Sequence, residues 1–176
     1  AVEEYAPFNA WAHESAHGGG HAFAEAAVVF ATSLPGGWCE AGEAPIANVL
    51  ATRLARLPAA RAGDDEIRHI LGAQIAEMLD FTGCRGSDLA WHMPGRQSTH
   101  SATKEQQLAL QDSAGRVPRW QPSENAVFGN FHGASTAFDL ALVLAGAPPG
   151  LGLLTWSDED GQLGSLLLQK NMAAAS

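Results

Sequence analysis

The hydrophobic positions fall into short continuous runs and longer spaced stretches, which predict strands and helices in alternation. Leu89–Pro94, Leu151–Trp156 and Leu163–Leu168 are largely apolar runs with the length and composition of buried strands. The last two runs are joined through Asp158–Gly161, whose turn chemistry predicts a hairpin. Residues 22–32 predict a further buried strand, entered from a flexible loop. Such alternation is typical of an α/β domain.

Three segments are expected to be helical: residues 44–57, 64–79 and 136–146. Residues 101–124 are expected to form a surface helix and then a Pro- and Trp-containing loop, Val117–Pro122. The acidic stretch Asp64–Glu66 favours a helix start, because carboxylates stabilise the positive end of the helix dipole. We expect Asp139 in the first turn of the last helix for the same reason. Gly146, which is followed by two prolines, should end that helix. The apolar stripes of the first two helices are expected to form core.

Composition restricts the function classes. The chain has 176 residues, enough for one domain with a core, and no apolar run approaches the length of a membrane span. Nineteen acidic residues against ten basic ones give a net charge of −9, which argues against binding nucleic acid. Two cysteines are too few for a disulfide framework, and the start Ala-Val-Glu-Glu lacks the features of a signal peptide. We therefore expect a cytoplasmic protein.

A His-Glu-x-x-His motif near the start is the most conspicuous chemical pattern. On a helix, His13 and His17 would share a face and could bind zinc, with Glu14 acting on a bound water. Three glycines directly follow His17, and they would destabilise the helix that has to hold both ligands. His21 lies too close to serve as the usual third ligand, although Glu25 could serve if the helix continued. A zinc-dependent hydrolase is therefore the alternative function, and a solvated His-rich loop is the simpler interpretation.

A second polar cluster lies in the last third of the chain, ahead of the helix at residues 136–146. Gly129 and Gly133 bracket Asn130 and His132, so two polar side chains sit where the backbone can bend sharply. The order is a short strand, a tight loop, an amphipathic helix and a closing hairpin. An ordinary unit of some other α/β domain would have the same order, so the residues alone leave the function open.

That order resembles the C-terminal end of the ketoacyl synthase III enzymes, which are thiolase-like condensing enzymes. The family pattern is Gly-Asn-x-x-x-Ala-Ser, then a helix, a buried strand, a glycine-bearing turn and a last strand. The residues that match it here are Gly129, Asn130, Ala134 and Ser135, with Gly161 and Gly164 in the turn region. The resemblance covers about residues 20–170, strongly at the end and weakly in the middle.

The resemblance implies a chemistry for which this chain holds only part of the residues. Such enzymes use a cysteine at a helix N-terminus as nucleophile, and a His and an Asn that hydrogen-bond the developing oxyanion. In the family, that cysteine belongs to the half of the fold that this chain does not match. Of the two cysteines here, Cys84 precedes a predicted strand and Cys39 lies in a loop, so both are expected to be inert. Gly95 stands where the family's His belongs. His92, three residues earlier, is either a displaced functional residue or a packed core histidine.

The resemblance also implies the organisation and partners of the chain. Residues 21–170 would form a thiolase-like half-domain with a mixed β-sheet flanked by helices, between a flexible segment at 1–20 and a frayed tail at 171–176. The half-domain would be a subunit of a ketoacyl synthase III-like condensing or acyl-transfer enzyme, either active or catalytically silent; the acidic residues 158–160 favour the silent form.

Its partners would be a cysteine-bearing chain of the same fold and an acyl-CoA or acyl carrier protein thioester. No cofactor, nucleic acid or membrane is expected, and such a half-fold should expose apolar surface when it is alone. Asn130 is the main candidate site residue, as a hydrogen-bond donor to the carbonyl oxygen. His92 and His132 are lesser candidates.

Overall fold

A computed structural model describes residues 2–3, 26–27, 45–57, 64–95, 100–121, 135–157 and 161–172 of the chain. The elements in chain order are β1 (Val2–Glu3), β2 (Ala26–Ala27), β3 (Ala47–Arg56), α2 (Asp64–Thr82), the 3-10 turn η2 (Gly86–Asp88), β4 (Leu89–Pro94), α3 (His100–Ala114), α4 (Ser135–Gly146), β5 (Gly150–Ser157) and β6 (Gln162–Lys170). β1 and β2 form a short antiparallel pair of their own.

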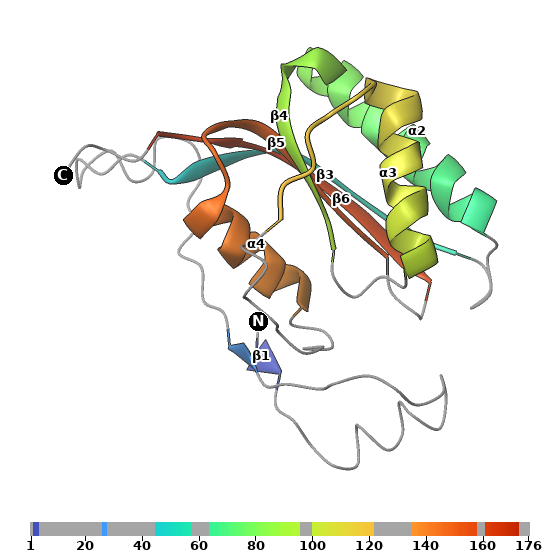
Figure 1. Ribbon diagram of the computed structural model, residues 1–176, viewed down its shortest axis with the longest axis horizontal. Helices are drawn as coiled ribbons and strands as arrows, with labels where there is room; N and C mark the ends of the chain where they lie inside the picture. The colour runs from blue at the N-terminus through green and yellow to red at the C-terminus, as the bar shows by residue number, and fades with distance from the viewer. Residues whose placement is uncertain are drawn as a thin grey trace.

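The four long strands form a mixed sheet in the order β3-β6-β5-β4 (Figure 1). β6 pairs antiparallel with both β3 and β5, and β5 pairs parallel with β4. The segment around Arg119 continues the sheet beyond β4 through a parallel bridge to His92. There, the His92 amide donates to the Pro118 carbonyl at 2.8 Å and the Trp120 amide donates to the His92 carbonyl at 2.8 Å.

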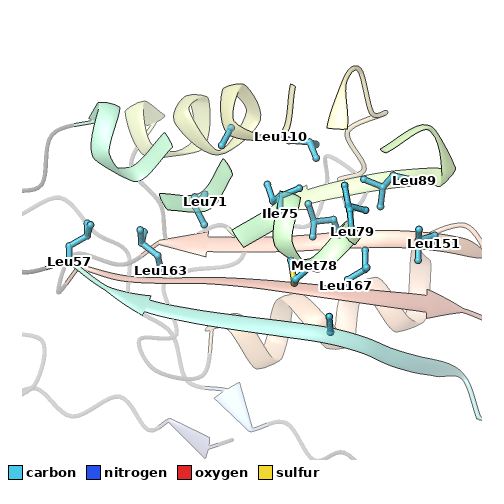
Figure 2. Packing of buried hydrophobic residues seen from close by; sticks show 13 residues of the cluster. Leu57, Leu71, Ile75, Met78, Leu79, Leu89, Leu110, Leu151, Leu163 and Leu167 are labelled. Atoms are coloured by element: carbon cyan, nitrogen blue, oxygen red, sulfur yellow. The ribbon is translucent and has the colours of Figure 1, made fainter. Parts of the chain in front are cut away.

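Helices cover both faces of the sheet, α2 and α3 on one and α4 on the other (Figure 1). Alternate residues along each strand face opposite layers. On β5, Leu153 packs in the cluster under α2 and α3, whereas Leu154 packs against α4. Figure 2 shows the larger cluster, in which side chains of α2 lie on side chains of β5 and β6; its labelled members include Ile75, Met78, Leu151 and Leu167.

The predicted helix at residues 44–57 is wrong, because this segment is the edge strand β3. The apolar spacing that imitated a helix comes from a β-bulge: the pairing with β6 shifts between Val49 and Ala51, so Leu50 is an extra residue. After the bulge, Ala51, Ala55 and Leu57 share the face toward α2 with the period of two that a strand requires. A single inserted residue thus turned an alternating pattern into one with helical spacing.

The remaining predictions of secondary structure that fall on described residues are confirmed. α2, β4, α3, α4 and the β5–β6 hairpin lie where the hydrophobic pattern predicted them, and the α/β fold with a mixed sheet flanked by helices is observed. The placement of Asp139 in the first turn is wrong, because α4 begins at Ser135, one residue before the predicted start; Asp139 lies in the second turn and is buried. The predicted strand at residues 22–32 is described only at Ala26–Ala27.

Candidate functional site

The described elements that border the predicted site are β4, β5 and the start of α4. α4 leads into β5 through a short link and packs along the same sheet, so the start of α4 lies toward the end of β5 (Figure 1). β4 runs parallel to β5, and therefore ends at the same edge. Asn130 and His132 precede α4 in the sequence but lie outside the described residues, so their roles stay predictions.

His92 is described, and it is 1% exposed on β4. It pairs with Leu153 in the parallel ladder, so its imidazole faces the layer of α2 and α3 and not the layer of α4. Its Nε2 atom lies 2.9 Å from the Thr155 hydroxyl. Burial, together with the nearby Arg119 guanidinium, lowers the pKa of His92 to about 3, so the imidazole is neutral near pH 7.

The Thr155 hydroxyl connects His92 to α3 through a buried chain of hydrogen bonds. Thr155 donates to Gln106 Oε1 at 2.8 Å, and Gln106 Nε2 donates to Ser157 Oγ at 3.1 Å. Because the Thr155 proton goes to Gln106, the hydroxyl oxygen accepts from Nε2–H of His92. This geometry is that of a core histidine with a satisfied hydrogen bond, which was the alternative to a functional role.

Gly95, the position that corresponds to the family's histidine, is closely packed. Its amide donates to the Thr155 carbonyl at 2.6 Å, which extends the pairing of β4 with β5. A Cβ atom at Gly95 would lie 2.9 Å from Cβ of Trp156 and 3.0 Å from the Thr155 carbonyl oxygen. Since these distances are shorter than ordinary carbon contacts, neighbouring backbone would have to move before position 95 could carry a side chain.

Trp156 closes this end of the sheet by lying across Gly164 of the neighbouring strand. The two residues are paired in the β5–β6 ladder, and a Cβ at Gly164 would lie 2.0 Å from the indole ring. Trp91 lies over Gly152 in the same way. Neither contact was predicted from the sequence. Trp156 and Gly164 face each other across the predicted hairpin, which is a readable sign of such stacking, whereas Trp91 and Gly152 are paired across two parallel strands that no local pattern brings together.

The described residues show neither an activated cysteine nor a metal centre. Cys84 is half-buried with its thiol 3.9 Å from the Thr82 carbonyl, and η2 and β4 follow it, so no α-helix begins there, as predicted. Within the described part of the chain, no three His, Cys, Asp or Glu side chains are close enough together to hold a metal ion. His13, Glu14, His17 and Cys39 lie outside that part.

None of the described helices has both the length and the apolar character that crossing a bilayer requires. No protein-family model matches the sequence, and no curated protein does either.

Solved structures do match. The ishigamide ketosynthase/chain length factor aligns with a TM-score of 0.63 at 19% identity, over 97% of this chain and 48% of that chain. The type II polyketide synthase acyl-carrier protein in complex with its ketosynthase, AntDE:AntF, aligns with a TM-score of 0.56 at 11% identity, over 76% of this chain and 36% of that one. Acat5 thiolase from Ascaris suum aligns with a TM-score of 0.51 at 19% identity, over 76% of this chain and 33% of that chain.

The chain thus spans half or less of the length of the solved proteins that it matches. The resemblance found in the residues around Asn130 is confirmed at the level of the fold: this chain is a half-domain with the thiolase fold of the condensing enzymes.

Proposed function

We propose that the chain is one subunit of an acyl-thioester condensing or acyl-transfer enzyme similar to ketoacyl synthase III, and that it supplies the half of the pocket that bears Asn130. The observation that carries the proposal is the half-length thiolase fold, with the sequence Gly129–Ser135 leading into α4. Two of the solved neighbours are a ketosynthase/chain length factor and a ketosynthase with its acyl-carrier protein. By analogy, the partners here are a second chain of the same fold and an acyl thioester on coenzyme A or a carrier protein, in the cytoplasm.

The division of labour follows from which residues the chain has. The partner contributes a cysteine thiolate, which attacks the acyl thioester and releases the carrier thiol. Decarboxylation of a malonyl thioester then gives the carbanion that attacks the acyl-enzyme carbonyl and expels the cysteine. Asn130 donates a hydrogen bond to the oxygen on which negative charge develops, and His132, on the same loop, is the second candidate donor.

The packing at Gly95 argues that this chain does not supply the family's histidine itself. A side chain at position 95 would press against Trp156 and the backbone of β5. His92 is neutral and hydrogen-bonded on the opposite face from α4, so its role in the proposal is to position β4 and β5. The histidine therefore comes from the partner chain, or the assembly carries out acyl transfer without it.

The test is to co-express the chain with a same-fold chain that carries a cysteine at the start of a helix, and to assay the purified pair. Acyl transfer from an acyl thioester and carbon dioxide release from a malonyl thioester are measured separately. Asn130→Ala should lower turnover about 100-fold or more, which is the usual cost of losing one oxyanion donor. Asn125→Ala, in the same stretch of sequence but outside the Gly-Asn loop, should leave turnover within about twofold.

Unchanged turnover in Asn130→Ala would contradict the role of Asn130. Failure of the chain to bind any such partner would contradict the proposed function as a whole. The zinc hydrolase alternative has no support among the described residues, and zinc analysis of untagged protein tests it directly.

A further inference from the structure

The edge strand β3 exposes large apolar side chains on one face only. Val49 is 62% exposed and Leu54 is 74% exposed, whereas Ala51 and Leu57 are buried under α2. Exposed aliphatic residues on a sheet edge favour association with other chains, and proteins usually avoid them. Their presence on this strand therefore requires a physical explanation.

Register places these side chains on the same face as α4. Val49 pairs with Leu168, which packs against α4, and Leu54 pairs with Gly164, on which Trp156 lies. Between them, Thr52 pairs with Leu166, which borders the same cluster. Paired residues in adjacent strands point to the same side of a sheet. We call Val49, Thr52 and Leu54 the β3 strip.

α4 covers the sheet beside the β3 strip but leaves the strip itself open. The helix packs on Trp91 and Met93 of β4, Leu154 of β5 and Leu168 of β6, and no residue of β3 is among the buried members of that cluster. Leu166 and Trp156, at the margin, are only half-buried and join the strip to the covered part. The strip thus continues a core layer that this chain does not complete among its described residues.

The composition of the strip fits a buried interface and not a solvated edge. The strip itself carries no charged residue, and Arg56, at the far end of β3, is the one charged residue on this face of the strand. An uncharged centre with its charge at the margin is the arrangement found in interface cores. On the opposite face, Arg53 of the same strand bonds to Glu77 of α2 at 2.8 Å, so that face is already complete.

The length comparison favours a partner of the same fold as the occupant of the strip. The 176 residues match 48% of a ketosynthase/chain length factor chain with 97% of their length, so that neighbour has a further half outside the matched part. We infer that the β3 strip, with Leu166 and Trp156, is the surface on which the partner chain of the same fold docks. This inference rests on the proposed function and adds to it the residues that form the contact.

The inference is tested by titrating variants of the chain against the cysteine-bearing partner used above and measuring the affinity of each. Leu54→Glu places a charge at the most exposed apolar residue of the strip and should weaken binding at least tenfold, as expected for a buried apolar contact in the complex. Phe81→Glu is the matched control: Phe81 is 73% exposed, but it lies on α2, beside Arg53 and on the opposite side of the sheet. Its affinity should stay within about twofold of the unmodified chain.

Val49→Glu is a second variant at a separate point of the strip and should also weaken binding. Circular dichroism and thermal unfolding of each variant check that the strand is retained, and amide hydrogen exchange of the complex should show protection on β3. Equal affinity of both strip variants and the unmodified chain would overturn the surface assignment while leaving the proposed function intact.

Absence of binding by the unmodified chain would instead refute the proposed function, and the docking surface with it. Self-association of the chain alone that is lost in Leu54→Glu would identify a second copy as the occupant, which also overturns the assignment to a different partner.

Discussion

At the scale of single residues, glycines beside tryptophans determine how the sheet closes. Trp91 lies against Gly152 and donates from its indole nitrogen to the Pro148 carbonyl at 3.1 Å. Trp156 lies on Gly164 in the same manner and also crowds Gly95.

The chemistry of single residues was only partly predictable, since the sequence left His92 as either a functional residue or a core residue. Its hydrogen bond to Thr155 depends on a residue 63 positions away, which no local pattern reveals.

Gly152→Ala should destabilise the protein by about 2 kcal/mol or more. The new methyl group would lie 2.0 Å from the Trp91 ring, and Trp91 is 1% exposed and cannot move aside without leaving its cavity. Gly72→Ala is the control, because its Cβ would lie 3.1 Å from the end of the Ser113 side chain and at an ordinary 3.8 Å from the Ala109 carbonyl oxygen. Urea unfolding measures both, and equal stabilities of the two variants would contradict the packing described for Trp91.

His92 should make stability dependent on pH in the mildly acidic range. The pKa of His92 is lowered to about 3 in the folded protein, while an unfolded histidine titrates near 6.5. The unfolded chain therefore binds a proton that the folded chain excludes, and stability is lost as pH falls from about 6.5 toward 3. The loss is about 1.4 kcal/mol for each pH unit in that window.

The measurement compares urea unfolding of the unmodified chain and His92→Gln between pH 4.5 and pH 7. Glutamine can still bond to Thr155 but has no proton to bind, so the variant should show a flatter pH profile. Identical profiles for the two proteins would show that His92 is protonated in the folded state or open to solvent.

At the scale of elements, helices were predicted more accurately than the edge strand. The apolar stripes of α2 and α4 are observed as buried faces, because each helix packs on one face of the sheet. The sequence of β3 predicts a helix because the bulge at Leu50 shifts the alternation of buried and exposed side chains by one residue. Pairing across the sheet, which sequence periodicity does not contain, decided its structure.

The end of α4 depends on a charged side chain from the last strand. Lys170 Nζ donates to the carbonyls of Val143, at 3.1 Å, and Ala147, so a cation meets the negative end of the helix dipole. Burial lowers the pKa of Lys170. Lys170→Met keeps the aliphatic stem but leaves two acceptors without their charged donor, and should cost about 1–3 kcal/mol.

Thermal unfolding tests this prediction, with Lys104→Met as the control because Lys104 is exposed on α3. The two variants remove the same charge, so the difference between them isolates the contact with α4. A drop in melting temperature of equal size in both would indicate a general effect of charge and not the loss of a helix cap.

At the scale of the whole molecule, the sequence predicted the fold class and the half-domain, because the closing third of the chain carries an ordered pattern of loop, helix and hairpin. The half-length match to ketosynthase and thiolase structures agrees with that prediction. The candidate site was less accessible to sequence reasoning. Asn130 and His132 lie outside the described residues, and the crowding at Gly95 arises from a strand 60 positions further along the chain.

The position of β6 between β3 and β5 has a consequence for biosynthesis. β6 is the last described strand to leave the ribosome, yet it is the direct neighbour of two strands made earlier. Until it emerges, the nascent chain holds β3 without its sheet neighbour and the leucines of β5 uncovered. β6 must therefore leave the ribosome before the sheet can close, and a nascent chain arrested before that point would expose apolar surface to which chaperones can bind.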